Sequence, residues 1–266
     1  MQIPAGPDSS TLLDAEVFGD GAPLLLIEGM SAHRGMWTDD LLDALTPHFS
    51  VAVYDHRGIG QSSRAEAAFT IADLAADARD VIDGLGWGSA HILGTSMGGM
   101  IAQELALGFP DHVRSLVLGC TTAGGPGSIS APGAARLVDA IASRDAARVA
   151  RTAFEVNLSP DFAARDGAFD RFVTLSTQRR VPSAVVAWQA AACAAHDTRD
   201  RLGDLAVPTT VVHGDVDEVI GVAEGERLAG AIPNAGLERW PGVGHMFWWE
   251  RPDETAELVR KISLER

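Results

Sequence analysis

The feature that most constrains the fold of this chain is the segment Gly94-Thr95-Ser96-Met97-Gly98, in which a serine lies between two glycines. Residues 91–93 before it predict a short strand, and residues 100–107 after it have a helical pattern. A serine on such a strand-to-helix turn is held in a strained backbone conformation. A Cβ atom at Gly94 or Gly98 would strike the neighbouring strand or helix. The pattern therefore predicts that Ser96 is a nucleophile presented on a tight turn.

Strand and helix patterns alternate on both sides of this turn, and a strand followed by a helix and another strand implies a parallel pair. Several of the strand segments are apolar throughout, which is typical of strands covered on both faces. We therefore predict an α/β fold with a mostly parallel central sheet and helices on both faces. The other predicted strands are residues 11–18, 24–27, 51–54, 114–118, 209–212 and 237–240. The other predicted helices are residues 37–45, 71–85, 223–231 and a last one that begins at Pro252.

This alternation stops between residues 121 and 205. A link rich in glycine, Gly124-Gly125-Pro126-Gly127-Ser128, is followed by Ala- and Arg-rich segments without a strand pattern. We predict a core formed by residues 1–120 and 206–266 and a helical cap inserted at residues 121–205, beside the carboxyl ends of the strands. The helices expected in the cap are residues 134–152, 166–177 and 183–195.

Charge and composition exclude several classes of partner. The 266 residues carry a net charge of −15, whereas a nucleic acid or an anionic membrane requires clustered Lys and Arg. The chain starts without a secretion-signal pattern and has no apolar run long enough for a membrane span, so we expect a cytoplasmic protein. Cys120 and Cys193 lack the spacing of metal ligands, and we expect neither a metal nor a disulfide. The sequence leaves open whether the protein forms a homodimer.

A serine hydroxyl needs a neighbouring base, which is usually a histidine. Among the eight histidines we favour His245, because it lies in a glycine-containing loop directly after a predicted strand. An imidazole base requires a carboxylate that holds its tautomer, and we favour Asp217 for this role. Asp215, nearer to the preceding strand, is expected to make turn hydrogen bonds instead.

A tetrahedral oxyanion needs two donors, and backbone amides are suited to this task because they are already oriented. We expect one donor to be the N–H of Met97, at the start of the helix after Ser96. The other is expected to be the N–H of Met30, in the loop after the strand at residues 24–27. The Met30 side chain either lines the acyl pocket or fills the core.

These residues resemble the α/β-hydrolase superfamily over nearly the whole chain. Residues 94–98 are similar to its nucleophile elbow, residues 213–217 to its acid loop, and residues 242–245 to its histidine loop. Residues 55–62 resemble a structural turn of the family, which implies a scaffold role for Arg57. One departure is Glu28, because many members have histidine before the glycine of the oxyanion loop. Glu28 either accepts hydrogen bonds from loop amides or acts near the substrate.

Among superfamily members the nearest likeness is to capped enzymes similar to 3-oxoadipate enol-lactonases. The resemblance and the residues together predict a serine hydrolase of a carboxylic ester or lactone that forms an acyl-enzyme on a small-molecule substrate, without a cofactor. Alternatives are a C–C bond hydrolase of a vinylogous diketone, a perhydrolase or haloperoxidase, and a ligand-binding protein without catalysis. Epoxide hydrolases and dehalogenases require an aspartate in place of Ser96.

Four residues are expected to contact the substrate: Glu28, His33, Trp188 and Trp249. Each also has a structural interpretation. The two tryptophans would otherwise be core residues, and His33 would otherwise be a solvated loop residue.

Overall fold

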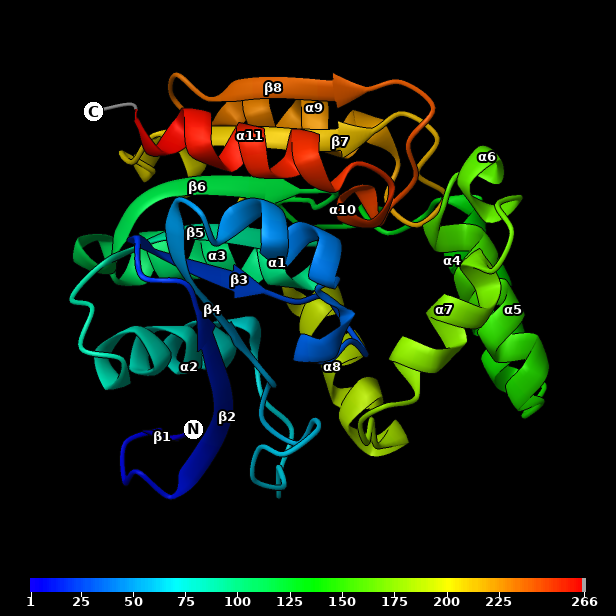
Figure 1. Cartoon of the computed structure of the whole chain (residues 1–266), viewed down its shortest axis with the longest axis horizontal. Helices are drawn as coiled ribbons and strands as arrows, with labels where there is room; N and C mark the ends of the chain where they lie inside the picture. Colours follow the sequence, from blue (N-terminus) through cyan, green and yellow to red (C-terminus); the bar gives the residue numbers. More distant parts are fainter. Residues whose placement is uncertain (265–266) are drawn as a thin grey trace.

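The computed structural model describes residues 1–264, whose centre is an eight-stranded sheet in the order β1-β2-β4-β3-β5-β6-β7-β8 (Figure 1). β1 and β2 pair antiparallel at one edge, and the six strands from β4 to β8 run parallel. The predicted mostly parallel sheet is therefore confirmed. The strands are β1 (Gln2–Ala5), β2 (Thr11–Phe18), β3 (Ala22–Ile27), β4 (Phe49–Tyr54), β5 (Ala90–Thr95), β6 (Val113–Gly119), β7 (Thr209–Gly214) and β8 (Gly236–Trp240).

Both faces of the sheet are covered, as the apolar strands require. In β3, Leu25 and Ile27 belong to one buried cluster, while Leu24 and Leu26 belong to a second cluster on the opposite face. The first cluster packs under α2 (Ile71–Gly84), α3 (Met97–Gly108) and α9 (Val222–Ala231). The second packs under α1 (Asp39–Leu45) and α11 (Pro252–Ser263).

Local signals place the ends of several helices. Thr70 and Asp73 form the reciprocal hydrogen bonds of a capping box before α2. α1 begins at Asp39 rather than at the predicted residue 37, because the Thr38 side chain accepts a hydrogen bond from the Leu41 amide and caps the helix. A 3₁₀ turn, η1 (Arg34–Met36), precedes it.

The segment between β6 and β7 contains helices and no sheet strand among the described residues. It holds α4 (Pro132–Ala142), α5 (Ala146–Asn157), α6 (Pro160–Ala163), α7 (Ala168–Ser176), α8 (Ser183–Ala195) and the 3₁₀ turn η3 (Leu202–Asp204). Figure 1 shows α4 to α7 beyond the arrowheads of β7 and β8, beside the carboxyl ends of the strands. The limits of a separate cap at residues 121–205 stay a prediction.

The prediction of a single helix at residues 134–152 is wrong, because α4 and α5 divide this range. Arg144 has a φ of 58°, which ends α4, and the Asp145 side chain then caps α5 by accepting from the amides of Ala147 and Arg148. α5 continues to Asn157. Residues 183–195 are confirmed as a helix, and α7 lies within the predicted 166–177.

Several short elements were not predicted, among them β1 and the single turn α10 (Phe247–Glu250). Both are too short to show a periodic pattern of their own. Within residues 1–264, none of the helices combines the length and the apolar character that crossing a membrane requires.

Gly98 brings the start of α3 into contact with the end of β3. An added Cβ would lie 2.0 Å from the carbonyl oxygen of Ile27, so G98A is expected to lower the free energy of unfolding by about 1–3 kcal/mol. Gly108, at the far end of α3, is the matched control because no atom lies within 4 Å of an added Cβ. Urea unfolding measures both variants. Equal stability of G98A and G108A would contradict the close approach of α3 to β3.

Candidate active site

Ser96 lies between β5 and α3 with φ 55° and ψ −120°, a conformation that L-residues rarely adopt. Within residues 91–100 it alone is not buried. Its amide donates to the carbonyl oxygen of Gly119, at 2.9 Å, which holds the turn against β6. A Cβ at Gly94 would lie 2.3 Å from the carbonyl oxygen of Gly98, which confirms the steric reason for both glycines. The turn therefore has the strained, presented form that the sequence predicts.

The loops after β7 and β8 bring Asp217 and His245 together. His245 Nδ1 lies 2.7 Å from Asp217 Oδ2, and both side chains are buried. This contact leaves Nε2 as the imidazole nitrogen that is free to take a proton. Asp215 does not contact His245; it accepts a hydrogen bond from the Gly242 amide at 2.8 Å, which joins the loops after β7 and β8 rather than making the local turn bond expected for it.

Asp217 remains ionised although it is fully buried. Burial by itself raises the pKa of a carboxyl group, but the charges and hydrogen bonds of His245 and His213 outweigh it and hold the pKa of Asp217 far below its usual range. Asp217 Oδ1 also accepts from the amides of Val219, at 2.8 Å, and Ile220, at 3.0 Å. The carboxylate is therefore oriented as well as charged.

Sequence reasoning assigned no role to His213, the first residue of the segment that resembles the family's acid loop. His213 Nε2 lies 2.8 Å from the carbonyl oxygen of Ile220 and 3.2 Å from Asp217 Oδ2. The signal was available, because His213 is near the end of β7 and only four residues before Asp217. A second imidazole therefore contacts the oxygen of Asp217 that also contacts His245.

Cys120 completes this buried group. The ligand atoms of Cys120, His213 and Asp217 lie within 4.8 Å of one another. The oxygens of Asp217 accept from the amides of Val219 and Ile220 and contact the two imidazoles. Burial and the nearby Asp217 charge raise the pKa of the Cys120 thiol well above its usual value. Its sulfur lies 3.8 Å from the carbonyl oxygen of Gly244, beside the histidine loop.

The loop after β3 lies directly against Ser96. A Cβ at Gly29 would lie 3.2 Å from Ser96 Cβ and 3.7 Å from Ser96 Oγ. Met30 follows and is partly exposed. Among the hydrogen bonds of residues 1–264, none uses the N–H of Met30 or of Met97. One unused amide therefore directly follows Ser96, and the other directly follows Gly29, the residue that lies against the serine.

Gln189, on α8, is a second residue that the sequence analysis missed. Its side chain is fully buried, and its Oε1 accepts from the amide of Ser31, at 2.9 Å. Ser31 has a φ of 61°, so this hydrogen bond holds the loop after Met30 in an unfavourable conformation. A helix of the inserted segment is thereby connected to the loop that contains Met30. Residues 31 and 189 are too far apart in the sequence to show this.

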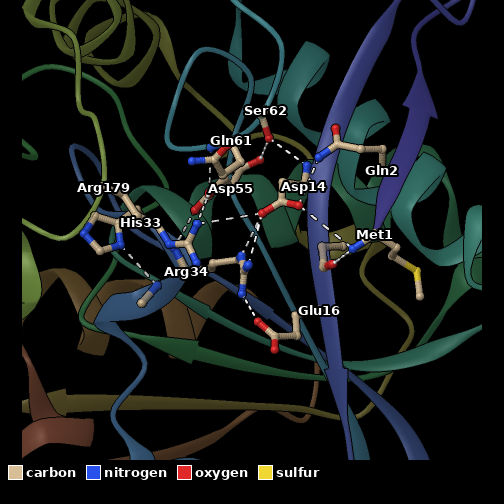
Figure 2. Close-up of polar contacts among 12 residues, drawn as sticks. Met1, Gln2, Asp14, Glu16, His33, Arg34, Asp55, Gln61, Ser62 and Arg179 are labelled. Carbon is tan, nitrogen blue, oxygen red and sulfur yellow. Dashed lines mark hydrogen bonds and ion pairs between the residues drawn. The ribbon is translucent and has the colours of Figure 1, made fainter.

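Asp55, at the end of β4, anchors the other side of this loop (Figure 2). Its Oδ1 accepts from the Arg34 amide at 2.8 Å, and its Oδ2 lies 3.6 Å from Arg179 Nη1. The Arg34 guanidinium in turn pairs with Asp14, at 3.1 Å, and with Glu16. Arg34 and Arg179 are thus occupied by carboxylates of the protein.

Arg57 has the scaffold role that the family resemblance implied. Its guanidinium donates two hydrogen bonds, of 2.7 and 2.6 Å, to the carboxylate of Asp77 on α2. Asp77 is itself buried. The arginine therefore ties the turn after β4 to α2.

The residues expected to contact substrate have different environments. His33 is buried rather than solvated, and its Nδ1 accepts from the Gly35 amide at 3.1 Å, which caps η1. Trp249 is buried, donates to the carbonyl oxygen of Met36 at 3.0 Å and packs on Phe172. These contacts favour structural roles for both residues.

Trp188 and Glu28 differ from those two. Trp188, on α8, is only partly buried and packs edge-on against Phe69, with ring centroids 6.3 Å apart. Glu28 is buried, and its Oε2 accepts from the amide of Gly29 at 3.2 Å, which is the loop-amide contact considered from the sequence. Substrate contact by any of the four residues stays a prediction.

A family model described as alpha/beta hydrolase fold matches residues 22–252. The chain is 28% identical to a poly(3-hydroxyalkanoate) depolymerase of Ectopseudomonas oleovorans, over 90% of this chain and 83% of that protein. Its structure is similar to that of a hydrolase from Pseudomonas aeruginosa PA01, with TM-score 0.84, 30% identity and coverage of 98% and 97%. It also shares the fold of the enol-lactonase from Burkholderia xenovorans LB400, with TM-score 0.83, 24% identity and full coverage of both chains.

Both thiols are expected to be unreactive in the native protein. Burial raises the pKa of Cys193 to about 12 and that of Cys120 well above its usual value, and only the thiolate is nucleophilic. Ellman's reagent should therefore modify the folded protein slowly and modify both cysteines at once in denaturant. Rapid modification of the native protein with loss of activity would contradict this site geometry.

Proposed function

The chain belongs to the alpha/beta hydrolase family, and we propose that it hydrolyses a carboxylic ester or lactone with Ser96 as nucleophile, His245 as base and Asp217 as the carboxylate that orients His245. The amides of Met30 and Met97 are the proposed oxyanion donors. The substrate is a small molecule, and the reaction requires no cofactor.

The observation that carries this proposal is the 2.7 Å contact between His245 Nδ1 and Asp217 Oδ2. It belongs to the loops after β7 and β8, whereas Ser96 follows β5 and Met30 follows β3. The carboxyl ends of neighbouring parallel strands lie at the same edge of a sheet, so these loops share one edge. A base, an oriented acid, a strained serine and two unused amides therefore occupy one edge.

The roles follow from the chemistry of these groups. His245 Nε2 takes the proton as Ser96 Oγ bonds to the carbonyl carbon, and the two amides bind the resulting oxyanion. The bond to the leaving oxygen breaks as His245 returns the proton to that oxygen, which leaves an acyl group on Ser96. Water then attacks the acyl carbon while His245 takes its proton. Collapse of the second tetrahedral species releases the acid and restores the Ser96 hydroxyl.

The choice of an ester or lactone rests on the nucleophile and on the comparisons. A serine supports acyl transfer, which excludes the alkyl-transfer chemistry that an aspartate performs in epoxide hydrolases and dehalogenases. Two of the similar proteins are named as a poly(3-hydroxyalkanoate) depolymerase and an enol-lactonase, and both names denote cleavage of ester bonds. These names support an ester as the substrate class.

A substrate panel tests the proposal. The protein is expected to turn over members of a set of aryl acyl esters and enol-lactones, and Ser96→Ala should reduce kcat/KM by about 10³-fold or more. Ser31→Ala is a matched control, because Ser31 is exposed and uses only its backbone in the loop hydrogen bond. The panel includes a vinylogous diketone and a peroxide-dependent halogenation assay. Turnover of the diketone alone, halogenation alone, or ester turnover that survives in Ser96→Ala would contradict the proposal.

A further inference from the structure

The backbone of Glu28 is clamped beside the nucleophile turn. Its carbonyl oxygen lies 3.0 Å from His56 Nε2, and an added Cβ at Gly98 would lie 2.7 Å from the same oxygen. Gly29, the next residue, lies against Ser96. A backbone movement that took the Glu28 side chain out of the loop would therefore also displace the turn that holds Ser96.

The carboxyl group of Glu28 lacks the partners that the other buried acids have. The carboxylate of Asp217 is contacted by two backbone amides and two imidazole nitrogens. Asp77 pairs with the guanidinium of Arg57. Glu28 is 1% exposed and accepts only from the Gly29 amide, and its Oε1 has no partner within residues 1–264. An unpaired buried carboxylate is unstable, whereas a protonated carboxyl group is tolerated.

The groups around Glu28 also oppose its ionisation. Asp55, which follows β4, places a negative charge near it, and the neighbouring His56 contacts the Glu28 carbonyl oxygen. Burial lowers the pKa of His56, so this imidazole is neutral at pH 7 and supplies no positive charge. Burial of Glu28, together with the negative charge of Asp55 and against the Gly29 hydrogen bond, raises the pKa of Glu28 to about 8.

We propose that Glu28 is a positioning residue that acts in its protonated form, keeping negative charge out of the loop that supplies the Met30 amide, so that its ionisation slows ester hydrolysis at alkaline pH. This inference rests on the proposed function. The oxyanion of the transition state carries a negative charge beside Gly29 and Met30, and a second negative charge in that loop repels it. Ionisation of Glu28 therefore gives the rate profile an alkaline limb.

The pH dependence of kcat/KM tests this inference. In the native protein, kcat/KM should fall above about pH 8, to about a tenth of its plateau one pH unit above the midpoint. Glu28→Gln keeps an oxygen for the Gly29 amide but cannot ionise, so its own profile should stay within about twofold between pH 7.5 and 9.5. Glu28→Met, which also lacks a charge, should lose the alkaline limb too. Glu66→Gln, at an exposed glutamate, is the matched control and should keep the limb.

Thermal unfolding supplies an independent measurement of the protonated state. A carboxyl group whose pKa is about 8 when folded and about 4.5 when unfolded destabilises the fold progressively as pH rises between those values. The Tm of Glu28→Gln should therefore exceed that of the native protein by a margin that grows from pH 5 to pH 8 and is constant above it. Glu66→Gln should show no such growth.

The two measurements separate the outcomes. A Tm difference that does not change with pH would show that Glu28 is ionised and would overturn the inference. An alkaline limb that persists in Glu28→Gln and Glu28→Met would also overturn it. A third outcome is a Tm difference with the expected pH dependence but no turnover of any ester. In that case the proposed function fails, and the positioning role of Glu28 fails with it. The protonated, buried Glu28 would then remain as a structural feature only.

Discussion

The structure depends on the close approach of the first turn of α3 to the last residues of β3. The approach is possible only because Gly98 lacks a side chain, since a Cβ there would lie 2.0 Å from the Ile27 carbonyl oxygen. It has two effects at once. The turn forces Ser96 into its strained conformation, and the same packing sets the Gly29-Met30 loop against the serine side chain. Nucleophile and proposed oxyanion donors are therefore positioned by one steric constraint.

The buried acids at this edge of the sheet differ in the number of groups that donate hydrogen bonds to them. Asp217 is buried with four polar contacts and stays ionised, Asp55 is buried with two amide donors and Arg179, and Glu28 is buried with a single amide. Asp217 and Glu28 differ in the donors around them, and each hydrogen bond to a carboxylate offsets part of the cost of its burial. A charged acid thus supports the proposed base, and a neutral acid lies in the loop beside the proposed oxyanion donors.

The sequence predicted the features that local physics determines. Alternating strand and helix patterns and the glycines around Ser96 each depend on neighbouring residues, and the structure confirms them. The contacts it did not predict are long-range. Gln189 reaches Ser31 across the inserted segment, and the break in the predicted cap helix depends on the positive φ of Arg144, a residue with no special turn preference. His213 was different, because its position four residues before Asp217 was already visible in the sequence.

The central claim is that Ser96 is the nucleophile of an ester hydrolase whose base is His245. Labelling with a fluorophosphonate probe, followed by mass mapping of the modified peptide, tests it most directly. The account predicts one adduct per chain, located on Ser96, with no adduct in folded Ser96→Ala and slower labelling in His245→Ala. A folded protein that is not labelled, or that is labelled at a residue other than Ser96, would contradict it.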